Sequence, residues 1–188
     1  HVVPRPPVKP DEPITIGFFG QFRREKHLEE LLRVYLSGNY TRPVRLLVQG
    51  STMHAEDAAE FERIIAAYEG KGISFLHRGL IGAEWQHAIS EVDALLLPYS
   101  APRYRYHWGA MLFTAIGFQK PVLTSDDMNP EVFAEYPVGV TFPSGDAAAL
   151  RGALETFINE YDSHIRAWST ALASAAAPYG PTQFTQRP

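Results

Sequence analysis

Six short runs of continuously apolar residues alternate with helical segments, and this alternation constrains the fold more than any other feature of the sequence. Apolar and polar side chains do not alternate within the runs, so both faces of each strand are expected to be covered. Such strands, separated by helices, are typical of a parallel sheet flanked by helices. The predicted strands are "ITIGFF" (14–19), "VRLLVQG" (44–50), "ISFLHRG" (73–79), "ALLLPYS" (94–100), "PVLTS" (121–125) and "GVTF" (139–142).

The segments between these strands have the spacing of amphipathic helices. In "EKHLEELLRVYLS" (25–37), the apolar face consists of Leu28, Leu31, Leu32 and Tyr35. Further helices are predicted over 55–70, 82–92, 109–118, 129–136, 144–161 and about 163–177. We therefore expect an α/β fold with an open, doubly wound, six-stranded parallel sheet of the Rossmann-like type.

The two ends of the sequence are expected to lie outside the folded domain. Five prolines in "HVVPRPPVKPDEP" (1–13) suppress helix formation and favour an extended linker. The last residues, 178–188, are predicted to form a loose tail. The domain itself is then expected to span 14–177, which is long enough for one sizeable hydrophobic core.

The composition excludes several classes of protein. With a net charge of −4, the chain gives no reason to expect nucleic acid as its main partner. It has no cysteine, which excludes disulfides, thiolate catalysis and cysteine-based zinc sites. No apolar run approaches the length of a transmembrane span, and the first residues lack a secretory signal. We therefore expect a cytoplasmic protein, and attachment to a membrane surface stays open.

The loops at the carboxyl ends of the strands are where an open parallel sheet binds its ligands. The segments that follow the first four strands are 20–26, 50–54, 77–82 and 99–109. The first of these loops places cations ahead of a helix, where they oppose the helix dipole. These cations, which follow Gly20, are Arg23, Arg24 and Lys26. They indicate either a bound phosphate or a solvated basic turn. Neither the Gly-x-Gly-x-x-Gly nor the Walker pattern is present.

Residues 99–109 form the second conspicuous loop, because they concentrate aromatic and cationic side chains immediately ahead of a predicted helix. Gly109 begins that helix, and the free backbone N–H groups of a helix N-terminus can bind an anion. The aromatic side chains either stack on a base or sugar, or form a small satellite core with the arginines in water.

The remaining candidate positions carry weaker signals. The loop 77–82, with Arg78 and Gly79, either holds a flat base against its backbone or is a plain strand-to-helix turn. Asp126 and Asp127 either touch a sugar or metal, or cap the helix predicted over 129–136, and capping is the favoured interpretation. The histidines His54, His87 and His164 lack metal-ligand spacing, and Trp168 is expected to pack in the core.

Taken in order, several segments resemble the C-terminal, nucleotide-sugar-binding half of GT-B glycosyltransferases. The most similar family is the retaining group called group 1 or family 4, and the resemblance covers about residues 13–160. The segments that carry it are "GFFGQFRREKHLEELLRVY", "VRLLVQG", "DALLLPYS", "WGAMLFTAIGFQKPVLTS" and "GVTFPSGDAAALRGAL".

This resemblance implies a donor site for a nucleotide-diphosphate sugar of the UDP or GDP type. The family pattern Gly-x-x-Arg-x-x-Lys-Gly, which binds the diphosphate, corresponds to Gly20, Arg23 and Lys26, with His27 in place of the last glycine. Backbone N–H groups at Gly109, Ala110 and Met111 would bind the same phosphates. The loop Arg78, Gly79 and Leu80 would hold the base. No metal ion is expected, since protein cations would neutralise the diphosphate.

The sequence departs from the family where the family carries two glutamates eight residues apart. Those positions are Tyr106 and Thr114 here, and Gln119 replaces the glycine before the Lys-Pro-Val segment. The resemblance puts Tyr106 near the sugar and the reacting carbon, and with Arg23 and Lys26 it is assigned to catalysis. Thr114 would contact the ribose, but a hydroxyl cannot accept two ribose hydroxyls as a carboxylate does.

Three functions fit these observations. The first is the donor-binding domain of a transferase that moves a sugar to a carbohydrate or lipid-linked acceptor with retention. Because an N-terminal acceptor domain would be needed, the chain alone is expected to be inactive. The second is a nucleotide-sugar-binding scaffold with a degenerate site. The third, a nucleotide-sugar epimerase, would depend on Asp126, Asp127 and His107, and it is favoured least among these.

Overall fold

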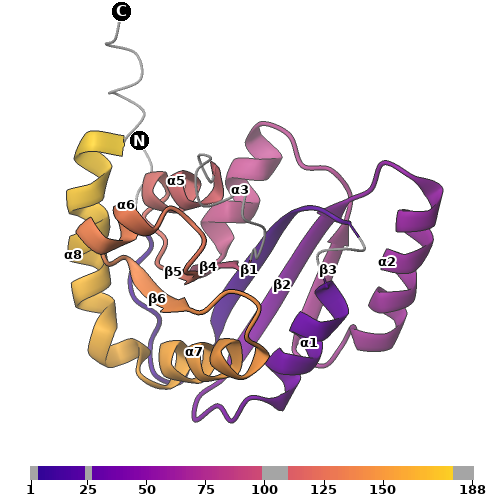
Figure 1. Ribbon diagram of the computed structural model, residues 1–188, viewed down its shortest axis with the longest axis horizontal. Helices are drawn as coiled ribbons and strands as arrows, with labels where there is room; N and C mark the ends of the chain where they lie inside the picture. The colour runs from indigo at the N-terminus through magenta and orange to yellow at the C-terminus, as the bar shows by residue number, and fades with distance from the viewer. Residues whose placement is uncertain (1–3, 24–26, 99–109, 180–188) are drawn as a thin grey trace, which may run out of the picture.

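A computed structural model describes residues 4–23, 27–98 and 110–179 of the chain, and it contains the six-stranded parallel sheet that the sequence predicts. The strand order is β3-β2-β1-β4-β5-β6, and every neighbouring pair is parallel. Figure 1 shows this sheet between its helices. The strands are β1 (Ile14–Gln21), β2 (Val44–Ser51), β3 (Ile73–His77), β4 (Ala94–Leu97), β5 (Val122–Ser125) and β6 (Gly139–Phe142).

The helices fall where the apolar spacing predicts them, with small shifts at their ends. They are α1 (Leu28–Ser37), α2 (Ala55–Tyr68), α3 (Ala83–Glu91), α5 (Ala110–Gly117), α6 (Pro130–Glu135), α7 (Ala147–Asn159) and α8 (Tyr161–Tyr179). The Asp146 carboxylate accepts a hydrogen bond from the Ala149 N–H and so caps α7. Helix α8 starts at Tyr161, earlier than predicted, and extends two residues past the predicted end of the domain at 177.

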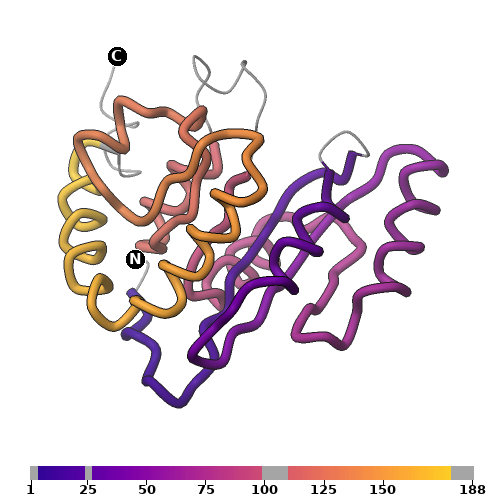
Figure 2. The backbone as a smooth tube through the Cα atoms, turned by 60° about the horizontal axis from the view of Figure 1, so that its bottom comes forward, coloured from indigo at the N-terminus to yellow at the C-terminus, as the bar shows by residue number. Residues whose placement is uncertain are grey.

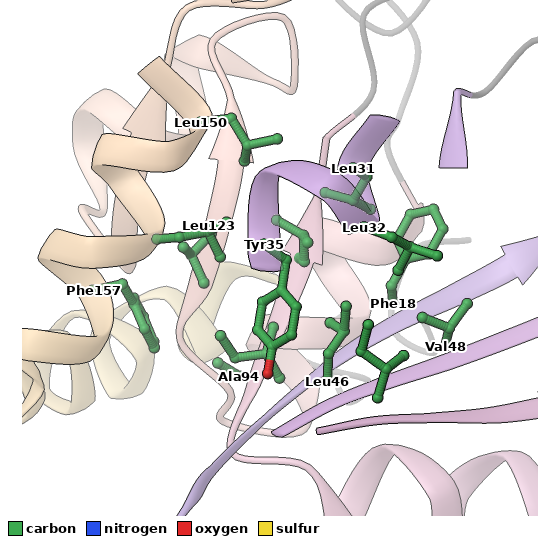
Figure 3. Close-up of a cluster of buried hydrophobic side chains, with 14 of the residues drawn as sticks. Phe18, Leu31, Leu32, Tyr35, Leu46, Val48, Ala94, Leu123, Leu150 and Phe157 are labelled. Carbon is green, nitrogen blue, oxygen red and sulfur yellow. The ribbon is translucent and has the colours of Figure 1, made fainter. Parts of the chain in front are cut away.

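Each face of the sheet has its own buried core. The first core joins the sheet to α1, α2 and α7, and Figure 3 shows part of it, including Leu32, Leu46 and Phe157. The second core joins the sheet to α3, α5 and α6. Helix α8 contributes to both, because Trp168 lies in the first core and Leu172 in the second. Trp168 stacks on Phe157 at 4.6 Å, which confirms that it packs in the core.

The order of the strands reverses direction at β1. From β1 the chain builds outward through β2 to β3, and then returns to place β4 on the other side of β1. Only Ile16 and Gly17 of β1 pair with β4, so the last residues of β1 project beyond this pairing. Helix α1, which follows β1, and helix α5, which follows β4, pack in the cores on opposite faces of the sheet, which is the arrangement that opens a ligand crevice.

The proline-rich segment 4–13 passes the start of α8 before it enters β1, and it is the indigo trace that leads into β1 in Figures 1 and 2. The Val8 N–H donates to the Tyr161 hydroxyl at 3.3 Å, and Arg42 donates to the Lys9 carbonyl at 2.8 Å. Near the start of this segment, the Arg5 guanidinium lies 3.5 Å from the Asp93 carboxylate. The segment predicted as a linker thus makes specific contacts with the domain.

Two residues that stand where the family has glycine adopt left-handed backbone conformations. His27, ahead of α1, has φ 52°, and Gln119, after α5, has φ 56°. Side chains disfavour this region, which explains why glycine suits both positions. Gln119 has a compensating contact, because its side-chain amide donates to the carbonyls of Ile116 and Leu172.

Across the described ranges, none of the helices combines the length and the hydrophobicity needed to cross a membrane.

Candidate functional site

Two glycines lie side by side where β1 and β2 end. Gly20 pairs in register with Gly50, and its φ of 148° is one that other residues rarely adopt. A Cβ atom added to Gly50 would lie 2.7 Å from the ring of Phe61. Because Gly50 has no side chain, the backbone at the end of β2 can pack closely against the ring of Phe61. The role of Gly20 beside a phosphate stays a prediction.

Arg23 follows β1 on a segment that aromatic packing holds in place. The ring of Phe22 stacks on Phe61 at 4.8 Å, and the Phe22 N–H donates to the Ser51 carbonyl at 2.8 Å. Arg23 is half-buried and donates to the neutral side chain of Gln21 at 3.2 Å. Because Gln21 is neutral, this contact does not neutralise the guanidinium charge. Lys26, the other cation assigned to the phosphates, lies outside the described residues.

Gln49 connects the loop after β1 to the loop after β3. Its side chain is 4% exposed, although the rest of its strand is largely apolar. The side-chain oxygen accepts a hydrogen bond from the Gly20 N–H at 3.1 Å, and the nitrogen donates to the Arg78 carbonyl at 2.7 Å. Gln49 was not among the residues singled out from the sequence, although an amide inside an apolar strand is an available signal.

The three residues assigned to the base lie directly after β3. Arg78 and Gly79 are exposed, and the Arg78 guanidinium forms an ion pair with Glu84 at 3.2 Å. Leu80 is partly buried and packs against the second core. The backbone of Gly79 is therefore accessible, whereas the side chain of Leu80 anchors the loop.

The start of α5 is the described part of the second conspicuous loop. Ala110 is exposed at the first position of the helix, and the side chain of Met111 packs against the second core. The first N–H groups of a helix lack partners within it, so Ala110 and Met111 can offer backbone donors. Gly109, predicted to belong to the same anion site, and Tyr106, assigned to catalysis, both lie outside the described residues.

Thr114 is committed to its own helix. Its hydroxyl donates to the Ala110 carbonyl at 2.8 Å, one turn earlier in α5. The hydroxyl hydrogen is therefore engaged, and the oxygen can still accept one hydrogen bond from a ligand.

The capping role favoured for Asp126 and Asp127 is wrong. The N-cap of α6 is Asn129, in a left-handed conformation without a side-chain capping bond. The Asp126 carboxylate instead accepts a hydrogen bond from the Ser144 N–H at 2.8 Å, which ties the end of β5 to the loop after β6. Two residues, Asp127 and Met128, separate Asp126 from Asn129, and the Asp126 carboxylate is directed toward the loop after β6 instead.

His77, at the end of β3, is held on both sides of its ring. Nε2 lies 3.0 Å from the Thr52 hydroxyl, and Nδ1 contacts the Glu62 carboxylate of α2. The ring also packs edge-on against Phe61 at 4.7 Å. These contacts fix the end of β3 against α2 and against the loop after β2, close to the predicted base loop.

Among the residues that the structure describes, no group of three or more His, Cys, Asp or Glu side chains is positioned to hold a metal ion. His87, expected on a helix surface, is exposed on α3.

The buried ionisable groups lie at the opposite, amino end of the strands. Burial lowers the pKa of Lys120 to about 8, and its ammonium donates to the Ser90 carbonyl at 3.0 Å. Burial also raises the pKa of Asp93, whose carboxylate accepts from the Thr15 N–H at 2.8 Å. Lys120 precedes β5 and Asp93 precedes β4, so both groups lie at the amino edge of the sheet rather than at the ligand edge, and Asp93 pairs with Arg5 of segment 4–13.

Comparison with solved structures identifies the same fold in glycosyltransferases. HepE from Anabaena, in complex with UDP and glucose, matches at 17% identity with a TM-score of 0.73, over 93% of this chain and 46% of its own. The galactosyltransferase WaaB of the lipopolysaccharide outer core matches at 17% identity with a TM-score of 0.70, over 98% of this chain and 50% of its own. This chain therefore spans about half the length of these relatives.

A shorter relative matches over most of its length. It is the C-terminal domain of a group 1 glycosyl transferase from Francisella tularensis, with 16% identity and a TM-score of 0.66, covering 93% of this chain and 87% of that one. A search of curated protein sequences found no match. The family model for glycosyl transferases group 1 matches residues 3–171. The chain thus belongs to the glycosyl transferases group 1 family, with the fold of a GT-B C-terminal domain.

Proposed function

We propose that this chain is the donor-binding domain of a glycosyltransferase, and that it binds a nucleotide-diphosphate sugar at the carboxyl edge of its sheet. One observation carries the proposal: the strand order reverses between β1 and β4, in a chain of the group 1 family. Gly20 and Arg23 follow β1, and the N-terminus of α5 follows the β4 connection. A diphosphate would be bound by the backbone at Gly20, the guanidinium of Arg23 and the N–H groups at the start of α5.

Catalysis by such a site would be mainly electrostatic. When the sugar leaves, negative charge develops on the nucleoside diphosphate, and Arg23, Lys26 and the N–H groups at Gly109 and Ala110 would stabilise it. Protein cations can do this without a metal ion, so we propose a metal-independent reaction. The loop Arg78–Leu80 would hold the base through its backbone.

The solved relatives support a UDP-type donor. HepE structures include complexes with UDP and with UDP-glucose, and another relative is described as a cholesterol-α-glucosyltransferase from Helicobacter pylori. We therefore propose transfer of a hexose, with retention, to a carbohydrate or lipid-linked acceptor. A second, acceptor-binding domain would complete the site, and this chain alone would not turn over. We propose a cytoplasmic location, including the surface of a membrane.

A second candidate function follows from the missing carboxylates. Tyr106 and Thr114 occupy the positions of the family's two glutamates, and the Thr114 hydroxyl already donates to Ala110. A domain of this kind would bind the donor as a scaffold without catalysing transfer. The two functions are distinguished by the activity of a protein that contains both domains. If that protein still transfers sugar after the double substitution Arg23→Ala and Lys26→Ala, this pocket has no catalytic role.

The proposal is tested by calorimetric titration of the chain with UDP and with GDP. We expect binding of at least one nucleotide in the micromolar to millimolar range, and at least a tenfold loss of affinity in Arg23→Ala. Arg151→Ala is the matched control, because Arg151 pairs with Glu155 on α7 and lies outside the proposed site. Absence of binding at millimolar nucleotide, or equal losses in the two variants, would contradict the assignment.

A further inference from the structure

A buried amide at position 49 lacks an explanation in the hydrophobic packing of the sheet. Central strands of parallel sheets are covered on both faces and are normally apolar. Gln49 nevertheless lies inside β2 with 4% of its side chain exposed. Burying an amide is unfavourable unless its polar atoms find partners, and both atoms of this one do. The partners, rather than the packing, therefore account for the residue.

Those partners fix the orientation of the amide without ambiguity. The Gly20 N–H can only donate, and it meets the side-chain oxygen at 3.1 Å. The Arg78 carbonyl can only accept, and it meets the side-chain nitrogen at 2.7 Å. Gln49 is thus a bridge across β2, with one bond to the end of β1 and the other to the residue after β3.

The two bridged residues belong to different parts of the proposed donor site. Gly20 lies at the end of β1, ahead of the segment with Arg23 proposed for the diphosphate, and Arg78 starts the loop proposed for the base. In a nucleoside diphosphate the ribose joins the base to the phosphates and limits the separation that these two ends can span. The affinity of the nucleotide therefore depends on the distance between the two loops as well as on each loop alone, as for any ligand that engages two sites at once.

We propose that Gln49 is a positioning residue that sets the spacing between the phosphate loop and the base loop, so that one nucleoside diphosphate can engage both. This inference rests on the proposed function. It adds a residue that makes no direct contact with the donor and acts through the backbone of Gly20 and Arg78.

Three substitutions test the two hydrogen bonds of Gln49 against a matched control. Gln49→Met keeps similar length and removes both hydrogen bonds. Gln49→Glu can still accept from the Gly20 N–H but turns an oxygen toward the Arg78 carbonyl. Gln119→Met is the matched control, because Gln119 also donates to two backbone carbonyls but follows α5, at the amino end of β5. Thermal unfolding of each variant identifies the folded proteins that enter the binding experiments.

The probes are UDP, which spans both loops, and uridine and inorganic pyrophosphate, which each reach one. In Gln49→Met we expect UDP affinity to fall at least tenfold, and the affinities for uridine and pyrophosphate to change less than threefold. Gln49→Glu should lose UDP affinity as well while it retains pyrophosphate binding. Gln119→Met should bind all three probes like the unmodified chain. GDP and guanosine are run in parallel as the second nucleotide pair.

The outcomes distinguish this inference from the function on which it rests. If the unmodified chain binds neither UDP nor GDP, the proposed function and the inference both fail. If it binds nucleotide and both folded Gln49 variants stay within twofold of it, only the inference fails. Equal losses for the nucleotide, the nucleoside and pyrophosphate would also overturn the inference, because they indicate general disruption rather than altered spacing.

Discussion

The buried ammonium of Lys120 should make the stability of the domain rise with pH in the alkaline range. Lys120 is 3% exposed, and burial lowers its pKa from 10.5 to about 8. Between these two values the unfolded chain binds more protons than the folded one, so raising the pH favours the folded state. Applying the linkage relation from about pH 7 to about pH 9.5 gives a gain of about 2 kcal/mol in the free energy of unfolding.

The assay is urea denaturation at a series of pH values on the unmodified chain and on Lys120→Met. The difference between the two proteins isolates the lysine, because both share the remaining titrating groups. Burial also raises the pKa of Asp93, and this carboxyl is present in both proteins. Burial raises the pKa of Tyr35 to about 12, so its effect lies above the range. Parallel pH profiles for the two proteins would refute the argument.

Three further substitutions test local features of the fold by urea denaturation. His27→Gly should raise the free energy of unfolding by about 0.5–1 kcal/mol, because it relieves a left-handed backbone, and an unchanged or lower value would contradict this. Asp146→Ala should lower it by about 1 kcal/mol through loss of the capping bond to the Ala149 N–H, whereas Asp146→Asn should retain most of it. Gly50→Ala should lower it by about 1–3 kcal/mol, since the new methyl group would lie 2.7 Å from the Phe61 ring; full stability would mean that the ring moves freely.

The sheet could be predicted from the sequence because its strands are largely apolar and a helical segment separates each strand from the next. Runs such as 94–97 have no polar face and can only be buried on both sides. The strand order could not be obtained in this way, because it depends on contacts between distant segments. The early start of α8 was missed because Tyr161 was counted with the preceding helix, which ends at Asn159 in the structure.

The candidate site was predictable where backbone geometry follows from residue type. Gly20, at the end of an apolar run, does have a backbone conformation that favours glycine. The roles of Gln49 and Asp126 were not predictable, since each side chain bonds to a backbone group of another strand or loop far along the chain. Sequence spacing carries no information about such partners. The assignments of Gly20, Arg23 and Arg78 to the donor stay predictions.

Amide chemical shifts of the isotope-labelled chain during a titration with UDP test the central claim most directly. The account predicts saturable shifts at Gly20, Arg23, Gly79 and Ala110, which belong to the loops and the helix terminus at the carboxyl edge of the sheet. Shifts confined to the amino edge, for example around Lys120, or no shifts at millimolar UDP and GDP, would contradict the claim that this edge binds the donor.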